Sequence, residues 1–156
     1  LSAHERRSLV SAGVIRLAAA RAFAREIVSA FDVRTPGVAT PASGLSGGNL
    51  QKFIVGREIL QKPGVLVVAQ PTWGVDAGAA AAIHEALIRL AGEGTAILLI
   101  SQDLDELLAL SDRLAVINGG LLSDAVAPDA ISVAEIGLLM GGIHGLEAAE
   151  VTADAP

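Results

Sequence analysis

The feature that most constrains the fold of this chain is a Ser-Gly-Gly turn that leads directly into an apolar helical pattern. Residues 45–52 read Leu-Ser-Gly-Gly-Asn-Leu-Gln-Lys. Ser46 is of a type that caps helix N-termini, and glycines allow a backbone to approach another group closely. A helix predicted over residues 47–61 would present its first-turn N–H groups and the positive end of its dipole. Such an arrangement is suited to binding a phosphate.

Two short apolar runs follow this helix, and each is typical of a strand in a parallel sheet. Residues 65–69 read Val-Leu-Val-Val-Ala, and residues 95–100 read Thr-Ala-Ile-Leu-Leu-Ile. Unbroken apolar runs of this length predict strands buried on both faces. A helix is predicted between them over residues 77–91, with Asp76 as its N-cap. The order strand, helix, strand indicates an α/β fold with a parallel sheet and right-handed crossovers.

The remaining elements are predicted from helical periodicity, capping residues and turn residues. They are an amphipathic helix at 14–31, a loop at 32–43, a helix capped by Asp103, a strand at 113–118, a helix capped by Ser132 and a disordered tail at 147–156.

Composition narrows the class of protein. The chain has 156 residues, which is the size of one domain, and it contains no Cys, so disulfides and thiolate metal sites are excluded. No apolar run reaches the length of a membrane span. The net charge is −6, which argues against a nucleic-acid partner. The chain starts at Leu1 rather than Met, and we expect it to be a fragment of a longer protein.

The order of these motifs resembles the ATP-binding cassette (ABC) ATPases over about residues 43 to 120. Residues 45–52 are similar to the signature motif of that family, and the Asn-x-Gln-Lys tail is similar to the branch that energises sugar and nucleoside import. Leu50 departs from that branch, where a Gln is usual. The positions after the two strands that match the family pattern are Pro71, Thr72, Gly74, Asp76, Ser101, Asp103 and Leu104. The resemblance implies a three-layer, parallel-sheet P-loop NTPase core.

Three positions depart from the family pattern, and all three belong to its catalytic site. Ala69 stands where the family places the Asp that holds Mg²⁺, and Gln70 stands where it places the Glu that activates water. Gln102 stands where the family places a switch His. An Ala side chain has no metal ligand and a Gln cannot accept the proton of a water. The resemblance therefore implies a degenerate catalytic centre with no metal site of its own.

The sequence contains no phosphate-binding loop of the form Gly-x-x-x-x-Gly-Lys-Ser/Thr, because Lys52 and Lys62 follow no such pattern. In the family this loop follows the first strand, upstream of the signature. The resemblance thus implies the C-terminal part of a second, degenerate nucleotide-binding domain, an incomplete core that lacks the first strand and the phosphate loop. Residues 1–43 would belong to the helical subdomain, and residues 44–146 would form the signature helix and the C-terminal part of the core.

The function implied by the resemblance is part of the ATPase subunit of an importer for a simple sugar or nucleoside, peripheral to the cytoplasmic face of the cell membrane. The residues expected to contact ATP across an interface with a second nucleotide-binding domain are Ser46, Gly47, Gly48, Asn49 and Asp76. Mg²⁺ would be present only in the complete domain dimer. Permease subunits and a substrate-binding protein would be further partners.

Two other classes of function stay open. One is a soluble ABC ATPase without a role in transport, against which the acidic composition and the Asn-x-Gln-Lys tail count. The other is a non-catalytic nucleotide-binding or interaction module, which the missing carboxylates favour for the chain by itself. We expect the isolated chain not to hydrolyse ATP, and we expect it to self-associate through an exposed sheet edge.

Overall fold

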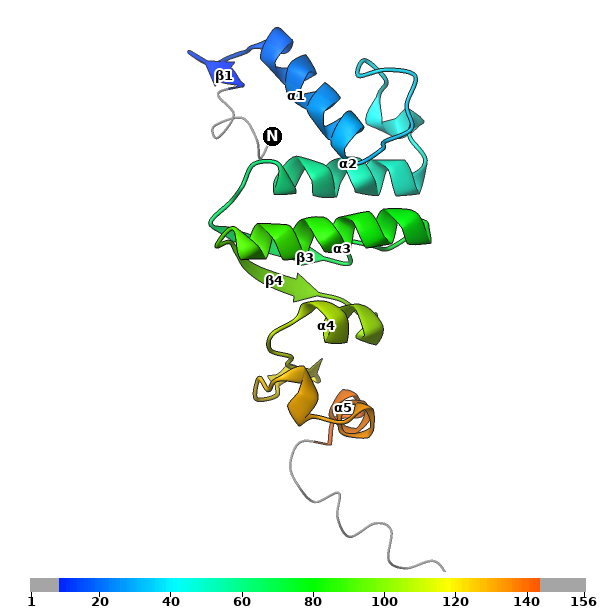
Figure 1. Cartoon of the computed structure of the whole chain (residues 1–156), viewed down its shortest axis with the longest axis vertical. Helices are drawn as coiled ribbons and strands as arrows, with labels where there is room; N and C mark the ends of the chain where they lie inside the picture. The colour runs from blue at the N-terminus through cyan, green and yellow to red at the C-terminus, as the bar shows by residue number, and fades with distance from the viewer. Residues whose placement is uncertain (1–8, 144–156) are drawn as a thin grey trace, which may run out of the picture. The chain divides into compact units, whose positions relative to one another are not determined.

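The computed structural model describes residues 9–143, and the chain divides into two compact units, Leu1–Gln102 and Asp103–Pro156 (Figure 1). The first unit contains the Ser-Gly-Gly turn and the parallel strands, and the second contains a hairpin and two helices. The tail predicted over residues 147–156 lies outside the described residues. The domain boundary expected between residues 43 and 44 stays a prediction.

From residue 9 onward, the first unit begins with a β-hairpin rather than with a helix. Strands β1 (Val10–Ser11) and β2 (Val14–Ile15) pair antiparallel, and helix α1 follows at Leu17–Ala30. The helix predicted over residues 14–31 therefore begins three residues late. Ala12 and Gly13 at the turn have φ angles of 49° and 77°, and this left-handed turn directs residues 14 and 15 back along β1.

Helix α1 packs on helix α2, which spans Gly47–Ile59. Phe23 and Ile27 of α1 are buried, with Phe53 and Leu60 packed against them. Gly56 lies inside α2 at the point where the ring of Phe31 meets it. A β-carbon at Gly56 would lie 2.5 Å from the Cδ2 of Phe31, so the contact requires glycine at this position.

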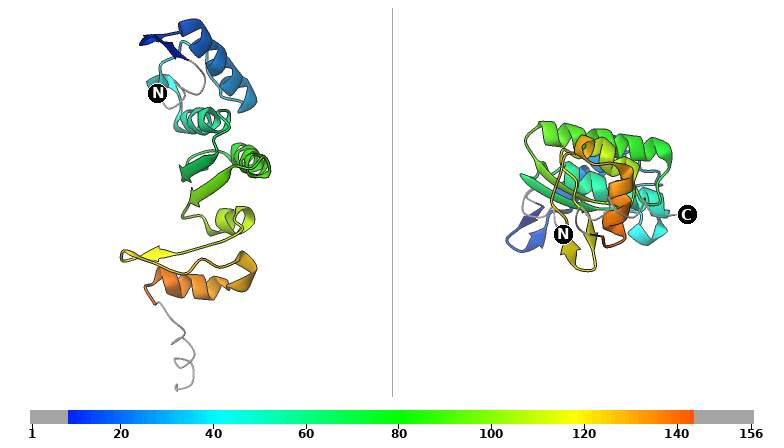
Figure 2. Two further views of the ribbon diagram at one scale, coloured as in Figure 1. Left: turned by 90° about the vertical axis from the view of Figure 1, so that its left-hand side faces the viewer. Right: turned by 90° about the horizontal axis from the view of Figure 1, so that it is seen from below.

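A strand–helix–strand unit follows, as predicted. Strand β3 (Val65–Ala69) and strand β4 (Ala96–Ile100) are parallel and in register from Val65 opposite Ala96 to Ala69 opposite Ile100. Helix α3 (Ala77–Gly92) connects them and lies along one face of this sheet (Figure 2). The predicted apolar stripe of α3 is buried, and its most enclosed residues are Ala79, Ile83, Ala86, Leu87 and Leu90.

The prediction that these strands are buried on both faces is wrong. Leu66 is 7% exposed, whereas its neighbours Val65 and Val67 are 67% and 62% exposed. Leu98 and Ile100 are also exposed, and the register places them on the same face as Val67. The apolar residues of these strands therefore lie on two different faces of the sheet. Helix α3 covers one face, and the other face is open in the part of the chain that the structure describes.

The second unit has a small core of its own. It contains α4 (Leu104–Leu110), a hairpin of β5 (Ile117–Asn118) and β6 (Leu121–Leu122), and α5 (Val133–Met140). Leu114, Val116 and Ile136 form its buried centre. The strand predicted over residues 113–118 is shorter than expected, because Leu114 makes only an isolated bridge with Val126. None of the helices formed by residues 9–143 has the length and apolar character needed to cross a membrane.

Candidate functional site

Ser46 caps helix α2, as the sequence predicts. Its φ and ψ angles of −64° and 156° are extended, and α2 begins at the next residue. The Oγ of Ser46 accepts a hydrogen bond from the backbone N–H of Asn49 at 3.5 Å. By helix geometry the first-turn amides of Gly47 and Gly48 have no acceptor within the helix. Gly47 is exposed and Gly48 is half-buried, so the start of α2 presents backbone donors at the surface of the first unit.

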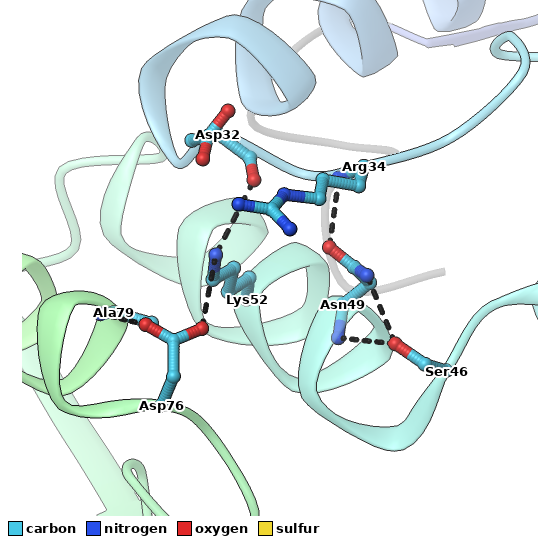
Figure 3. Close-up of polar contacts among 7 residues, drawn as sticks. All are labelled: Asp32, Arg34, Ser46, Asn49, Lys52, Asp76 and Ala79. Carbon is cyan, nitrogen blue, oxygen red and sulfur yellow. Dashed lines mark hydrogen bonds and ion pairs between the residues drawn. The ribbon is translucent and has the colours of Figure 1, made fainter.

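The side chain of Asn49 ties this start to the loop after α1 (Figure 3). Its Nδ2 donates to the Oγ of Ser46 at 2.9 Å, and its Oδ1 accepts from the backbone N–H of Arg34 at 2.7 Å. Both polar atoms of the Asn49 side-chain amide are therefore engaged in hydrogen bonds within the chain. Sequence reasoning missed Arg34, because its hydrogen bond to Asn49 comes from a backbone N–H that no residue type reveals. Alongside a hydrogen bond from the backbone N–H of Ala79, which is the larger cause, the charge of the Arg34 side chain also helps to lower the pKa of Asp76.

Gly47 and Gly48 differ in their surroundings. A β-carbon at Gly47 would have no atom within 4 Å, whereas one at Gly48 would lie 3.0 Å from the carbonyl oxygen of Gly74. It would also lie 3.6 Å from the Cα of Val75. The loop that precedes α3 therefore packs directly on the first turn of α2, and only Gly48 is required for that close approach.

Lys52 and Asp76 form a second link between α2 and this loop (Figure 3). The Nζ of Lys52 lies 3.8 Å from the Oδ2 of Asp76, and it donates to the backbone carbonyl of Asp32 at 3.4 Å. Lys52 is one of two buried polar or charged residues among the described residues. Its side chain joins three segments: the end of α1, helix α2 and the start of α3.

Asp76 also caps α3, as the sequence predicts. Its Oδ1 accepts from the backbone N–H of Ala79 at 2.9 Å. This hydrogen bond is the main cause that holds the pKa of Asp76 below its ordinary value of 3.8, and the positive charge of Lys52 acts in the same direction. Asp76 is therefore a carboxylate at neutral pH, with one oxygen on a helix cap and the other facing a buried ammonium.

Ala69, Gln70 and Gln102, the three positions that depart from the family pattern, lie at the carboxyl ends of the two parallel strands. Ala69 ends β3 beside Ile100, which ends β4, and the backbone N–H of Gln70 donates to the carbonyl of Ile100 at 2.8 Å. Gln70 has a φ of 50°, so the chain turns sharply here. Gln102 follows the end of β4 and is exposed. The structure thus brings Ala69 and Gln70 together with the end of β4 at one edge of the sheet.

Gln51 is a site residue that sequence reasoning did not identify. Its Nε2 donates to the backbone carbonyls of Gln70 at 3.0 Å and of Pro71 at 3.1 Å. Pro71 is fully buried. The turn after β3 is therefore anchored to helix α2 by a side-chain amide. The Gln-Lys pair at positions 51 and 52 was the only available sequence signal.

These strand-end residues do not fit a magnesium ion. The methyl group of Ala69 offers no ligand atom, and Gln70 offers at most a neutral amide. In the described part of the chain, no group of three or more His, Asp or Glu side chains is placed to hold a metal.

Comparison with solved structures shows the fold. The ATP-binding subunit of an ABC transporter superimposes on the chain with a TM-score of 0.67 at 18% sequence identity, over 77% of this chain and 53% of that one. No family model matches the chain. The parallel strands, the capped helix α2 and the following loop together have the architecture of part of an ABC ATPase domain.

Comparison with curated sequences makes the assignment more specific. The nucleoside import ATP-binding protein NupA of Lactococcus lactis is 50% identical over 119 residues, which is 76% of this chain and 24% of that protein. A ribose import ATP-binding protein of Rubrobacter xylanophilus is 38% identical over 135 residues, or 86% of this chain and 26% of that protein. The chain belongs to the ABC ATPases, and the relatives that it matches are ATP-binding proteins named for nucleoside or sugar import. It spans about a quarter of the length of these curated relatives.

Proposed function

We propose that this chain is part of the ATP-binding subunit of an ABC importer for a simple sugar or a nucleoside, and that it supplies a signature half-site. One observation carries the proposal: the Ser46-capped start of α2 presents backbone donors, while Ala69 and Gln70 leave the adjacent strand end without a carboxylate. A helix N-terminus of this kind favours a phosphate. The names of the relatives support sugar or nucleoside import.

In this proposal the chain completes an ATP site that a second nucleotide-binding domain holds. Ser46, Gly47, Gly48 and Asn49 would face the γ-phosphate, and Asp76 would lie at the interface. The second domain would supply the phosphate loop and Mg²⁺. A membrane permease would be the attached partner, with a substrate-binding protein in the same system, and the subunit would lie on the cytoplasmic face of the membrane.

Asn49 has a specific part in this half-site. Its amide donates to the Oγ of Ser46, and its own oxygen is engaged by Arg34. The lone pairs of Ser46 are thereby directed toward Asn49, which leaves the Ser46 hydroxyl proton as the group able to donate to an anion. Asn49 then acts mainly by orienting Ser46 rather than by reaching the phosphate itself.

In the intact transporter, the ATP site to which this strand end belongs would bind ATP without hydrolysing it efficiently. Gln70 can hydrogen-bond a water molecule but cannot accept its proton. Loss of a general base alone typically lowers a rate by about 10²–10⁴-fold. We therefore propose that the 156-residue chain by itself has no ATPase activity. A phosphate-release assay on the purified chain checks this, and release above background that Ser46→Arg abolishes would contradict it.

The half-site itself is tested in the full-length transporter reconstituted in membranes. Ser46→Arg removes the cap and places a guanidinium at the helix start, so we expect ATP turnover and cargo uptake to fall on the order of 10²-fold or more. Gln70→Ala is the matched control at the degenerate position, and we expect most turnover to persist. If Gln70→Ala stops turnover and Ser46→Arg does not, the two roles are reversed and the proposal is wrong.

A further inference from the structure

We propose that Lys52 is a positioning residue. It holds the loop at Asp76 in a fixed position relative to Ser46 and Gly48, so that a displacement of this loop changes the signature half-site. The inference rests on the proposed function, because it concerns how that half-site is controlled. It assigns a role to the buried ammonium of Lys52, which neither caps α2 nor faces the phosphate in the proposed function.

The spacing along α2 is the first observation. Gly48 and Lys52 are four residues apart, so they share one face of the helix. Both contact the same loop: Gly48 approaches the carbonyl of Gly74, and Lys52 faces the carboxylate of Asp76. The loop is thus held at two points by one side of α2, and Ser46 caps that same helix.

The surroundings of Lys52 are the second observation. The Lys52 side chain is 9% exposed, and burying an ammonium is unfavourable unless it is paired. Its partners are the Asp32 carbonyl and the Asp76 carboxylate, which come from two other segments (Figure 3). Asp32 has a φ of 45°, a conformation uncommon for a residue other than glycine. The chain therefore adopts an unfavourable turn at the residue whose carbonyl accepts from Lys52.

The exposure of Asp76 separates a positional role from a purely stabilising one. Its side chain is 73% exposed, so water screens the ion pair and the gain in stability is small. The carboxylate nevertheless has two fixed neighbours, since Oδ1 binds Ala79 and Oδ2 faces Lys52. A movement of the loop relative to α2 must change the contact between Asp76 and Lys52, because Ala79 belongs to the helix that the loop itself leads into.

The test is a double-mutant cycle in the full-length transporter. The variants are Lys52→Met, Lys52→Arg, Asp76→Asn and the double variant Lys52→Met with Asp76→Asn. For Lys52→Met we expect kcat for ATP turnover to fall roughly tenfold with KM nearly unchanged, because the lost positioning acts in the transition state. Lys52→Arg keeps the charge and restores most of kcat. In the Asp76→Asn background, Lys52→Met has no further effect, since the two residues act as one unit.

Lys62 provides the matched control. It also forms an ion pair, with the Oε2 of Glu93 at 2.8 Å, but its side chain is 72% exposed and lies at the other end of α2. Lys62→Met should leave kcat and KM as they are. Circular dichroism of the 156-residue chain shows whether each variant folds. If Lys52→Met does not, Lys52→Gln replaces it in the cycle.

The outcomes distinguish the inference from the proposed function. Suppose that Ser46→Arg abolishes turnover. The positioning role is then wrong, and the half-site stands, if Lys52→Met leaves kcat unchanged. The same holds if Lys52→Met lowers kcat by the same factor with and without Asp76→Asn. If Ser46→Arg leaves turnover intact, the half-site itself is wrong. If Lys52→Met lowers kcat when Asp76 is present but not in the Asp76→Asn background, the role of Lys52 is supported.

Discussion

The carbonyl oxygen of Gly74 lies 3.0 Å from the position that a β-carbon on Gly48 would occupy. That distance is shorter than a comfortable contact between a methyl group and a carbonyl, and backbone atoms on both sides have little freedom to move. The preceding residue, Gly47, has open space at the equivalent position. Of these two adjacent glycines, only Gly48 lies at a position where a larger side chain would meet the backbone of the neighbouring loop.

Gly48→Val should destabilise the chain by about 1–3 kcal/mol, the usual cost of forcing extra methyl groups into a close contact. Gly47→Ala is the matched control, and it should be neutral or stabilising by about 0.4–1 kcal/mol, because alanine restricts the unfolded chain. Urea denaturation followed by circular dichroism measures both. Equal losses of stability in the two variants would show that the loop does not rest on Gly48.

The contact between Gly56 and Phe31 gives a second prediction. A β-carbon at Gly56 would lie 2.5 Å from the Phe31 ring, so Gly56→Ala should destabilise the chain by about 1–3 kcal/mol. Elsewhere in a helix interior the same change is stabilising by about 1 kcal/mol. Combining Gly56→Ala with Phe31→Leu should recover part of the loss. If the double variant is as unstable as the sum of the two single changes, the ring is not the obstacle.

The capping box of α5 should make stability depend on pH. The Ser132 hydroxyl and the Ser132 backbone N–H each donate to Oε2 of Glu135 at 2.7 Å. The hydroxyl is the larger cause, and together the two donors hold the pKa of Glu135 below its ordinary value of 4.5. The folded pKa is lowered, so this stabilisation is present above pH 4.5 and is lost as the pH falls through the lower folded value.

Glu135→Gln tests this dependence. The variant should melt at a lower temperature than the parent chain at pH 7, and the difference should shrink as the pH approaches 3. Ser132→Ala removes one of the donors and should reduce the pH dependence in the same direction. A difference in melting temperature that stays constant from pH 7 to pH 3 would mean that the carboxylate of Glu135 is not engaged in the cap.

The open face of the β3–β4 sheet predicts self-association of the isolated chain. Val65, Val67 and Leu98 are 67%, 62% and 56% exposed on this face, and an open apolar sheet tends to pair with another copy. Leu98→Lys should shift the chain toward monomer in light scattering. Ile88→Lys is the control, because Ile88 is 57% exposed on α3. A chain that is already monomeric at high concentration would contradict the prediction.

Local signals predicted where three of the helices start. Ser46, Asp76 and Ser132 each cap the expected helix, because a cap depends on one side chain and the amides directly after it. The order of strands and α3 also followed from the sequence. The exposed face of β3 did not, because Val65 and Val67 are as apolar as Leu66 and no periodicity separates them.

The contacts of the site were less predictable than its members. Asp32 and Arg34 contribute backbone atoms, and such contributions leave no trace in residue type. Gln51 contacts a turn that follows it by about twenty residues, a distance that only the folded chain brings together. The early hairpin at Val14 was missed because the apolar pattern continues from it into α1 without a break.

The hydrogen bonds from Gln51 have a consequence for how such a site can change over time. They hold the turn after β3 through the carbonyl oxygens of Gln70 and Pro71, and Gln70 is further held through its own N–H. These hydrogen bonds to the turn after β3 involve only backbone atoms of residue 70, so they do not depend on its side chain. Side chains of different chemistry can therefore occupy position 70 on the same turn, and Gln70→Glu would add a carboxylate at this strand end without rebuilding the turn.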